Sequence, residues 1–373
     1  MRQAAALNAS DEKLQMSIGG LLFECGFQEQ GLTTLEALRR DRPDDTHIAY
    51  VVGIMQLTAG NFERGWRDFI HREIRRTKIE SRPWLQARLP LNLRGKSVRL
   101  IREQGLGDEL FFLRYAPLLK SLGAEIAHVT DPKLKSILDR TTCIDEVINE
   151  PADGTREQVL QPAAPSTIGM LVGDLPHALY RDFAEHCREL PPPLALSALP
   201  ERIAALREKL SVLGPPPYLA LTWRGGTAPH EQKGKWWTLY KNIGLEAFGK
   251  ALTGVPHTLL AVQRKPLAAE IAELSAAAGI PIHDLCDVND DLEDMLALLA
   301  IVDEYVGVSN TNMHLRAGLQ RSARVLVPRP SEWRWMAYGN QSPWFPGFEV
   351  YRQGIDGTWQ DALDRLRTHL LNR

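Results

Sequence analysis

Apolar residues recur at three- and four-residue intervals through the first 80 positions of the chain, which is the spacing of amphipathic helices. Two such segments occupy residues 11–45 and two more occupy residues 46–76. Gly60 and Asn61 separate the last two, where a turn between helices is expected. The pattern therefore predicts an all-helical N-terminal segment over residues 1–85.

A different pattern begins near residue 95, where short apolar runs alternate with amphipathic stretches. The predicted strands cover 97–103, 124–130 and 145–150, and the predicted helices cover 109–122 and 132–139. This alternation is typical of a parallel sheet with helices on its faces. Proline-rich stretches on either side of a helix that begins near residue 201 mark a boundary, so we place a first sheet domain over residues 86–200.

The alternation restarts after these prolines and continues to the end of the chain. Strands are predicted over 218–223, 257–263, 281–286, 304–309 and 323–328, and helices over 245–252, 267–279, 291–303, 311–320 and 358–371. We therefore expect an α/β fold in which two doubly wound, Rossmann-like domains follow the helical segment, the second over residues 201–373. Open α/β sheets bind ligands at the carboxyl ends of their strands, so we expect a ligand cleft between the two domains.

Composition narrows the class of protein. Apolar residues make up 44% of the chain and the net charge is −2, which gives no reason to expect a nucleic-acid partner. The four cysteines are scattered and form no CxxC pair, so we expect reduced thiols in a reducing compartment. No apolar run approaches the roughly 18 residues of a transmembrane helix and the N-terminus lacks a signal-peptide pattern, so a cytoplasmic protein is expected.

Candidate chemistry begins at "EQGLGDEL", where a predicted strand runs through a glycine turn into a helix. Gly105 and Gly107 permit a tight turn and close approach of a ligand to the backbone. Asp108 or Glu109 could act there as a general base. The alternative is that Asp108 is an N-cap of the helix, worth about 1 kcal/mol.

Two further clusters favour phosphate binding. The loop over residues 222–239 follows a strand and carries Arg224, Lys233 and Lys235 among glycines, which suits a diphosphate; it could equally be a surface loop. Another strand ends at Ser309, and a helix beginning with Asn310 or Thr311 would direct free N–H groups at an anion. Here the alternative is capping by Asn310 and core packing of His314.

The segment over residues 328–347 concentrates aromatic residues around Arg334. Trp333, Trp335 and Trp344 could stack a base or a sugar, or could form a hydrophobic seal between domains, and the sequence leaves both interpretations open. No two-histidine metal spacing occurs, and the carboxylates of residues 287–294 are placed as helix caps. A metal site is therefore not expected.

Taken together, these motifs resemble two known families. The helices joined at "AGNFERG" resemble a unit of the tetratricopeptide repeats. The remainder is similar to the ADP-heptose lipopolysaccharide heptosyltransferases, which have a GT-B fold. "EQGLGDELFFLRYAPLL", "GKWW" and "VGVSNTNMHLRAGL" resemble three elements of that family, and the resemblance covers most of residues 45–352.

The resemblance implies an inverting, metal-independent glycosyltransferase with a nucleotide-diphosphate sugar as donor and no cofactor. By position, Asp108 matches the proposed base, Lys235 a diphosphate-binding lysine, and Thr311 and His314 the donor-phosphate turn. The chain departs from the family pattern at that turn. The family's Asp-Thr-Gly is Asn310-Thr311-Asn312, and Arg316 replaces an alanine, which puts the identity of the donor in doubt.

Three functional hypotheses follow from these observations. The first is sugar transfer to an acceptor glycan or protein, with the acceptor held by the tetratricopeptide-like segment. The second is a catalytically inactive GT-B scaffold that binds a nucleotide or a protein, which the altered "NTN" turn motivates. The third is a sugar-nucleotide epimerase, which would require more cleft carboxylates than the sequence supplies.

Overall fold

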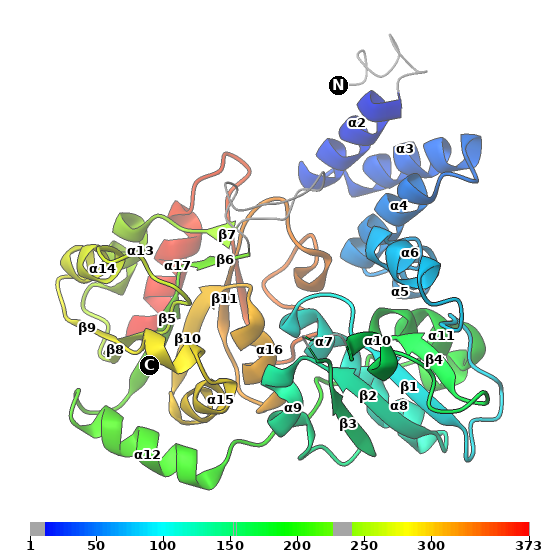
Figure 1. Ribbon diagram of the computed structural model, residues 1–373. Coiled ribbons are helices and arrows are strands. Elements are labelled where there is room, and N and C mark those ends of the chain that lie inside the picture. The colour runs from blue at the N-terminus through cyan, green and yellow to red at the C-terminus, as the bar shows by residue number, and fades with distance from the viewer. Residues whose placement is uncertain (1–11, 152, 154, 227–240, 373) are drawn as a thin grey trace. The chain divides into compact units, whose positions relative to one another are not determined.

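The structure is a computed structural model that describes residues 12–151, 153, 155–226 and 241–372 (Figure 1). The chain divides into two compact units. The first contains the chain up to Lys135 together with Thr142–Pro191 and Pro330–Tyr338. The second contains Ser136–Thr141, Pro192–Arg329 and the chain from Gly339 onward. Neither unit is therefore a single continuous stretch of sequence.

Helices fill the N-terminal segment as predicted, and its described residues form five where four were expected. They are α2 (Glu12–Glu24), α3 (Gln28–Asp41), α4 (Thr46–Ala59), α5 (Phe62–Phe69) and α6 (Glu73–Glu80). α2 pairs with α3, and α4 pairs with α5. In the α2–α3 pair, a Cβ atom on Gly31 would lie 2.6 Å from the Gly19 carbonyl oxygen. In the α4–α5 pair, a Cβ atom on Gly65 would lie 2.9 Å from the Leu57 backbone nitrogen, and Gly53 has equally little room. Glycine thus permits close helix contact in each pair.

The first sheet is parallel, with strand order β3-β2-β1-β4. Its strands are β1 (Ser97–Ile101), β2 (Glu125–Thr130), β3 (Glu146–Asn149) and β4 (Ile168–Leu171). The helices of this part are α7 (Leu106–Phe112), α8 (Ala116–Ser121), α9 (Pro132–Leu138), α10 (Arg156–Val159) and α11 (Leu175–Asp182). The three strands predicted from the sequence are present, and β4 is an additional strand.

The second sheet is also parallel, with strand order β12-β11-β10-β5-β8-β9. Its strands are β5 (Tyr218–Thr222), β8 (Thr258–Ala261), β9 (Ile282–Asp284), β10 (Glu304–Val308), β11 (Arg324–Val327) and β12 (Glu349–Arg352). A two-stranded antiparallel ribbon, β6 (Arg224–Gly225) with β7 (Lys241–Asn242), follows β5.

Helices flank the second sheet on two sides (Figure 1). They are α12 (Pro200–Ser211), α13 (Leu245–Leu252), α14 (Glu270–Ala278), α15 (Leu292–Ile301), α16 (Thr311–Gly318) and α17 (Gln360–Leu371). α13 packs against α14 and α17, and α15 packs against α12 and α16. Strands buried on both faces explain the nearly continuous apolar runs in the sequence. The α/β class with two parallel sheets and an N-terminal helical region is confirmed.

Candidate functional site

Each parallel sheet has one point at which the strand order reverses. In the first sheet the chain starts at β1, builds outward through β2 and β3, and then places β4 on the other side of β1. In the second it starts at β5, continues through β8 and β9, and then places β10 on the other side of β5. Ligands bind open α/β sheets at such switch points, outside the carboxyl ends of the strands. These two places are therefore the candidate sites.

Asp108 lies at the first switch point, in the opening turn of α7 directly after β1. Its Oδ2 atom accepts a hydrogen bond from the Gly105 backbone N–H at 3.3 Å, and its Oδ1 atom forms an ion pair with Arg334. The N-cap residue of α7 is Gly105, and Asp108 at the third helical position closes a capping box with the Gly105 N–H, so Asp108 has a capping role although it is not the N-cap itself. The Asp108 side chain is 27% exposed, so the carboxylate is held and still accessible.

The glycines of this turn adopt ordinary backbone conformations. Gly105 is extended, with φ −74°, and Gly107 lies inside α7. Neither is among the positive-φ glycines of the described chain. The turn from β1 into α7 therefore does not depend on the positive φ angles that glycine allows, and close approach of a ligand to these glycines stays a prediction.

Glu109 differs from Asp108 because its side chain is completely buried. It accepts hydrogen bonds from His128 Nε2 at 2.8 Å, from the Thr130 hydroxyl and from Arg102 Nε at 3.1 Å. Arg102 in turn contacts Asp131 and Glu150 at the ends of β2 and β3. Glu109 thus joins α7 to the carboxyl ends of three neighbouring strands.

A buried charge cluster fills the other side of the same switch point. Glu103 follows β1 and Asp174 follows β4, and both side chains are fully buried. Arg72, at the start of α6, donates to Glu103 at 2.7 and 2.9 Å and to Asp174 at 2.6 Å. Arg75 also donates to Asp174, at 2.9 Å. Burial disfavours the charged guanidinium of Arg72, but the two carboxylates outweigh burial and raise its pKa.

The N-terminal helices are therefore part of the first switch point. Arg72 from α6 bridges the two strand ends, and His177 of α11 donates from Nδ1 to the Trp66 carbonyl of α5 at 3.3 Å. Tyr50 of α4 lies within electrostatic range of Asp108, Arg334 and Arg72. Burial raises the pKa of Tyr50 although the two arginines oppose the shift, so its phenol is neutral. The Tyr50 hydroxyl, a hydrogen-bond donor, and the Asp108 carboxylate thus lie in the same part of the first unit.

The aromatic segment around Arg334 is core rather than a binding platform. Trp333 packs edge-on against Trp66 at 5.2 Å and Phe111 at 5.0 Å between ring centroids. Trp333 and Trp335 are buried in the first unit, and Trp344 is buried in the second. Stacking on a base or a sugar requires an exposed ring face, which these three indoles lack.

The second switch point lies between β5 and β10. Asn310 caps α16, since its Oδ1 atom accepts from the Asn312 backbone N–H at 3.0 Å and from the Tyr305 hydroxyl at 3.1 Å. Its Nδ2 atom donates to the Thr222 hydroxyl of β5 at 3.1 Å. The predicted capping role of Asn310 is present, and the same side chain ties the ends of both strands together.

The other predicted residues of this turn surround that cap. Ser309 is buried at the end of β10, and Thr311 is half-buried in the first position of α16. Asn312 is helical and is not among the positive-φ residues of the described chain, so no glycine is required there. His314 is 9% exposed and packs edge-on against Phe345 at 5.3 Å, as its core-packing interpretation expected.

The Arg316 side chain is hydrogen-bonded to main-chain carbonyl groups. Its guanidinium donates to the carbonyl oxygens of Leu299, of Val302 at 2.9 Å and of Asp303 at 3.0 Å. These carbonyls lie at or just beyond the C-terminus of α15. The arginine that departs from the family pattern therefore caps a helix within the second unit, and its side chain is directed at main-chain oxygens.

Arg224 also has a structural partner. It forms two hydrogen bonds with Glu270, at 2.8 and 3.0 Å, which fix it against α14. Gly225 next to it approaches the β10–α16 turn, because a Cβ atom there would lie 2.9 Å from the Ser309 carbonyl oxygen. Lys233 and Lys235 lie outside the described residues. Lys241 pairs with Gly225 in the β6–β7 ribbon and is 8% exposed, so it is a largely buried cation of that ribbon.

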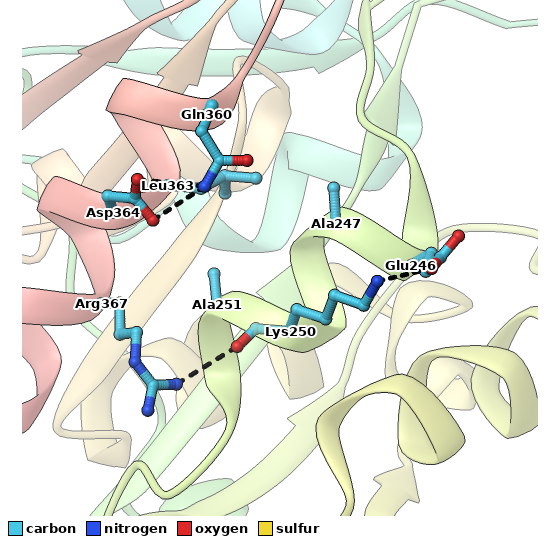
Figure 2. Close-up of a pocket in the computed structure, with 8 residues that line it drawn as sticks. All are labelled: Glu246, Ala247, Lys250, Ala251, Gln360, Leu363, Asp364 and Arg367. Atoms are coloured by element: carbon cyan, nitrogen blue, oxygen red, sulfur yellow. Dashed lines mark hydrogen bonds and ion pairs between the residues drawn. The ribbon is translucent and has the colours of Figure 1, made fainter.

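A groove elsewhere on the second unit is a poor candidate. It has a volume of about 320 Å³ and lies between α13 and α17. Figure 2 shows that its polar residues interact with one another: Lys250 with Glu246, Gln360 with Asp364, and Arg367 with the Lys250 carbonyl. None of the site residues predicted from the sequence lines it.

Histidine, cysteine and carboxylate side chains of the described residues form no cluster of three or more that could bind a metal ion. In the same part of the chain, every helix is too short or too polar to cross a membrane.

Several residues of the two switch points escaped the sequence analysis. Glu103 is the last residue of the strand predicted over 97–103, whereas β1 ends at Ile101 and Glu103 follows it. Asp174 was missed because β4 was missed. Thr222 and Tyr305 carry no distinguishing pattern, and only the strand order brings them to Asn310.

Comparisons with known proteins support the fold. No protein-family model matches the chain. Protein FlbA of Caulobacter vibrioides is 25% identical over 374 residues, which cover 93% of this chain and 59% of FlbA. The chain thus spans about three fifths of that relative's length.

Two solved structures have the same architecture. A glycosyl transferase family 9 protein of Veillonella parvula has a TM-score of 0.54 at 12% identity, with 77% of this chain and 99% of that chain covered. The ADP-heptose lipopolysaccharide heptosyltransferase II of E. coli has a TM-score of 0.50 at 14% identity, with 74% and 99% covered. The predicted heptosyltransferase-like GT-B fold is therefore confirmed.

Proposed function

We propose that the protein is an inverting, metal-independent glycosyltransferase that moves a sugar from a nucleotide-diphosphate sugar to an acceptor hydroxyl. One observation carries the proposal. In a fold shared with glycosyltransferases, the accessible carboxylate of Asp108 lies at the switch point of one sheet, and the predicted phosphate-binding turn lies at the switch point of the other.

The first unit would supply the base. Asp108 accepts the proton of the acceptor hydroxyl while that oxygen attacks the anomeric carbon. The bond from the anomeric carbon to the diphosphate oxygen breaks, and the diphosphate leaves with the bonding electrons. Glu109 is too deeply buried and too fully hydrogen-bonded for this task, so we give it the supporting role of fixing α7.

The second unit would hold the donor. The N-terminus of α16 and the Thr311 hydroxyl would bind the diphosphate, in a turn that Ser309, Asn310 and Asn312 shape. Lys233 and Lys235 would neutralise its growing charge. Arg224 and His314 would support the donor site without contacting the diphosphate, because Arg224 is hydrogen-bonded to Glu270 and His314 packs against Phe345.

The helical segment supports a proposal about the acceptor. The close glycine contacts of the two helix pairs recur 34 positions apart, at Gly19 and Gly53 and at Gly31 and Gly65. That period is the length of a tetratricopeptide repeat, and such repeats form binding surfaces for other chains. A protein acceptor, or a glycan on one, is the acceptor class that this similarity favours.

The second candidate function is a GT-B scaffold that binds a nucleotide or a protein without turnover. The engagement of both Asp108 oxygens, by Gly105 and by Arg334, is the observation that favours it. The scaffold predicts binding of a sugar nucleotide that is unaffected by Asp108→Asn and is followed by no release of nucleoside diphosphate.

Calorimetry against ADP-, UDP-, GDP- and dTDP-sugars, with Mg²⁺ and with EDTA, tests the proposal. We expect micromolar binding of one nucleotide class in both conditions, with loss of binding in Lys235→Ala. Slow release of the nucleoside diphosphate to water should accompany binding and should fall at least 100-fold in Asp108→Asn. Binding without release in the wild type would favour a nucleotide-binding scaffold, and no binding at all would exclude the glycosyltransferase and leave the protein-binding scaffold.

A further inference from the structure

Residues 330–338, which we call the strap, belong to the first unit, although the chain directly before and after them belongs to the second. The chain leaves the second unit after Arg329 and returns to it at Gly339. Between these points the strap makes main-chain contacts with the N-terminal helices. The Ala337 N–H donates to the Thr58 carbonyl of α4 at 3.1 Å, and the Tyr338 hydroxyl donates to the Phe23 carbonyl of α2 at 3.3 Å.

The strap is anchored well enough to hold an unfavourable backbone conformation. Met336 has φ 61°, which a residue other than glycine rarely adopts and which costs about 1–3 kcal/mol. Trp333 on one side of it is buried among Trp66, Phe69 and Phe111. Contacts on both sides of Met336 therefore fix the course of the strap over the first unit.

Arg334 is the residue that the strap presents to the first switch point. Its guanidinium carbon lies 4.4 Å from the Trp333 ring centroid and 4.8 Å from that of Phe111, and the residue is 9% exposed. An arginine held against two aromatic rings has little freedom to turn. Its Nη2 atom forms the ion pair with Asp108 Oδ1.

Two donors consequently orient the Asp108 carboxylate. The Gly105 N–H binds Oδ2 from the backbone of α7, and Arg334 binds Oδ1 from the strap. Each carboxylate oxygen has two lone-pair directions, so one on each remains for another donor. Because the Asp108 side chain is 27% exposed, such a donor can approach it from solvent.

We propose that Arg334 is a positioning residue that holds the Asp108 carboxylate in the orientation in which it accepts the acceptor's proton. The inference rests on the proposed function, since it gives Arg334 a task only if Asp108 is the base. It also places one requirement for turnover in a segment more than 200 positions away from Asp108 in the sequence. Arg334 acts through Asp108 and does not itself touch the reacting atoms.

The test is a double-mutant cycle on the full chain, with Arg334→Gln, Asp108→Asn and the double variant. The readout is release of nucleoside diphosphate to water from whichever of the ADP-, UDP-, GDP- and dTDP-sugars binds most tightly. We expect Arg334→Gln to lower kcat by roughly 100-fold and to leave the donor KM unchanged. The double variant should be no slower than Asp108→Asn alone, because Arg334 has no other route to the reaction.

Two further variants separate positioning from folding. Arg82→Gln removes an ion pair to Glu157 in the same unit and should keep full turnover. Arg334→Lys keeps the charge without the planar guanidinium, and should retain the thermal unfolding midpoint of the wild type with an intermediate kcat. If Arg334→Gln does not fold, Arg334→Lys carries the test.

The outcomes distinguish the inference from the proposed function. Wild-type kcat in Arg334→Gln, or losses that multiply in the double variant, would overturn the role of Arg334 while Asp108 remains the base. Full turnover in Asp108→Asn would remove Asp108 as base and the inference with it. No turnover of any sugar nucleotide by the wild type would overturn the proposed function itself.

Discussion

At the scale of single residues, the first two of the three departures from the heptosyltransferase pattern have structural explanations. Asn310 occupies the position of the family's acid and still caps α16, since an amide oxygen accepts from a helix N-terminus as a carboxylate does. Asn312 replaces a glycine at a position with helical backbone geometry, where any residue fits. The altered turn therefore keeps a capped helix N-terminus at α16.

The third departure, Arg316, leads to a stability prediction. Arg316→Met keeps much of the side-chain volume but leaves the buried carbonyls at the end of α15 without their donor. We expect the free energy of unfolding of the second unit to fall by about 2–4 kcal/mol, which urea titration would measure. Arg321→Met, an exposed arginine five positions on, is the control and should leave the unfolding midpoint unchanged. A similar midpoint for both variants would contradict the capping role.

The sequence was informative about residues that follow strands and uninformative about their partners. Asp108, Ser309 and Asn310 were found because they lie where predicted strands lead into predicted helices. The partners Arg334 and Glu270 could not be found, because an ion pair between positions 108 and 334 leaves no local pattern. For the same reason, Arg224 was predicted to bind phosphate although the structure pairs it with a carboxylate.

At the scale of secondary-structure elements, the cluster of Arg72, Arg75, Glu103 and Asp174 binds the N-terminal helices to the first sheet. Arg72→Leu would leave two buried carboxylates short of their main donor. We expect the free energy of unfolding of the first unit to fall by about 3–5 kcal/mol, measured by urea titration with tryptophan fluorescence. Arg76→Leu on the same helix removes only an exposed pair with Glu73 and should have no measurable effect. Equal midpoints would show that the helices dock by other contacts.

His177 gives the same interface a pH dependence. Burial lowers the pKa of His177, although its hydrogen bond to the Trp66 carbonyl opposes the shift. The unfolded chain therefore binds more protons than the folded one below the usual histidine pKa of about 6.5. Stability is present above that pH and is lost as pH falls through the lowered pKa of the folded state.

We therefore expect the urea midpoint of the first unit to be lower at pH 5.5 than at pH 7.5. His177→Gln should reduce that difference, because glutamine does not titrate. His186→Gln, at an exposed position, should keep the full difference. An unchanged pH difference in His177→Gln would assign the effect to other groups.

Most elements were predictable because their apolar periodicity is strong. The helices α13 and α17 and the strands β1, β5 and β10 lie within the predicted ranges or close to them. The edge strands β4 and β12 were missed. β4 has four residues, one of them Gly169, whose missing Cβ makes room for the Trp84 ring, and glycine carries no strand signal. β4 is recognised as a strand only in the structure, where it pairs with β1.

At the scale of the whole molecule, each unit depends on a piece of chain from the other's part of the sequence. The strap completes the first unit, and Ser136–Thr141 belongs to the second. We expect a fragment of residues 12–191 to bind a hydrophobic dye and to unfold at a lower urea concentration than the first unit of the full chain. Without Trp333, the rings of Trp66 and Phe111 lose a buried neighbour.

A synthetic peptide of residues 328–340 should reverse both effects when it is added to the fragment. The same peptide with Trp333→Ala is the control and should restore neither, because it lacks the ring that packs between the helices. A fragment that binds no dye and unfolds like the full chain would show that the first unit is complete without the strap.

The late position of the strap in the sequence also affects the protein while it is being made. The last earlier part of the first unit ends at Pro191, and the strap begins at Pro330, so about 140 residues must be translated between them. At roughly 5–20 residues per second, a ribosome takes roughly 7–28 s over that stretch. Throughout this interval Trp66 and Phe111 of the nascent chain lack their contacts with Trp333. A chaperone that binds apolar segments would therefore bind these rings before residues 330–338 have been translated.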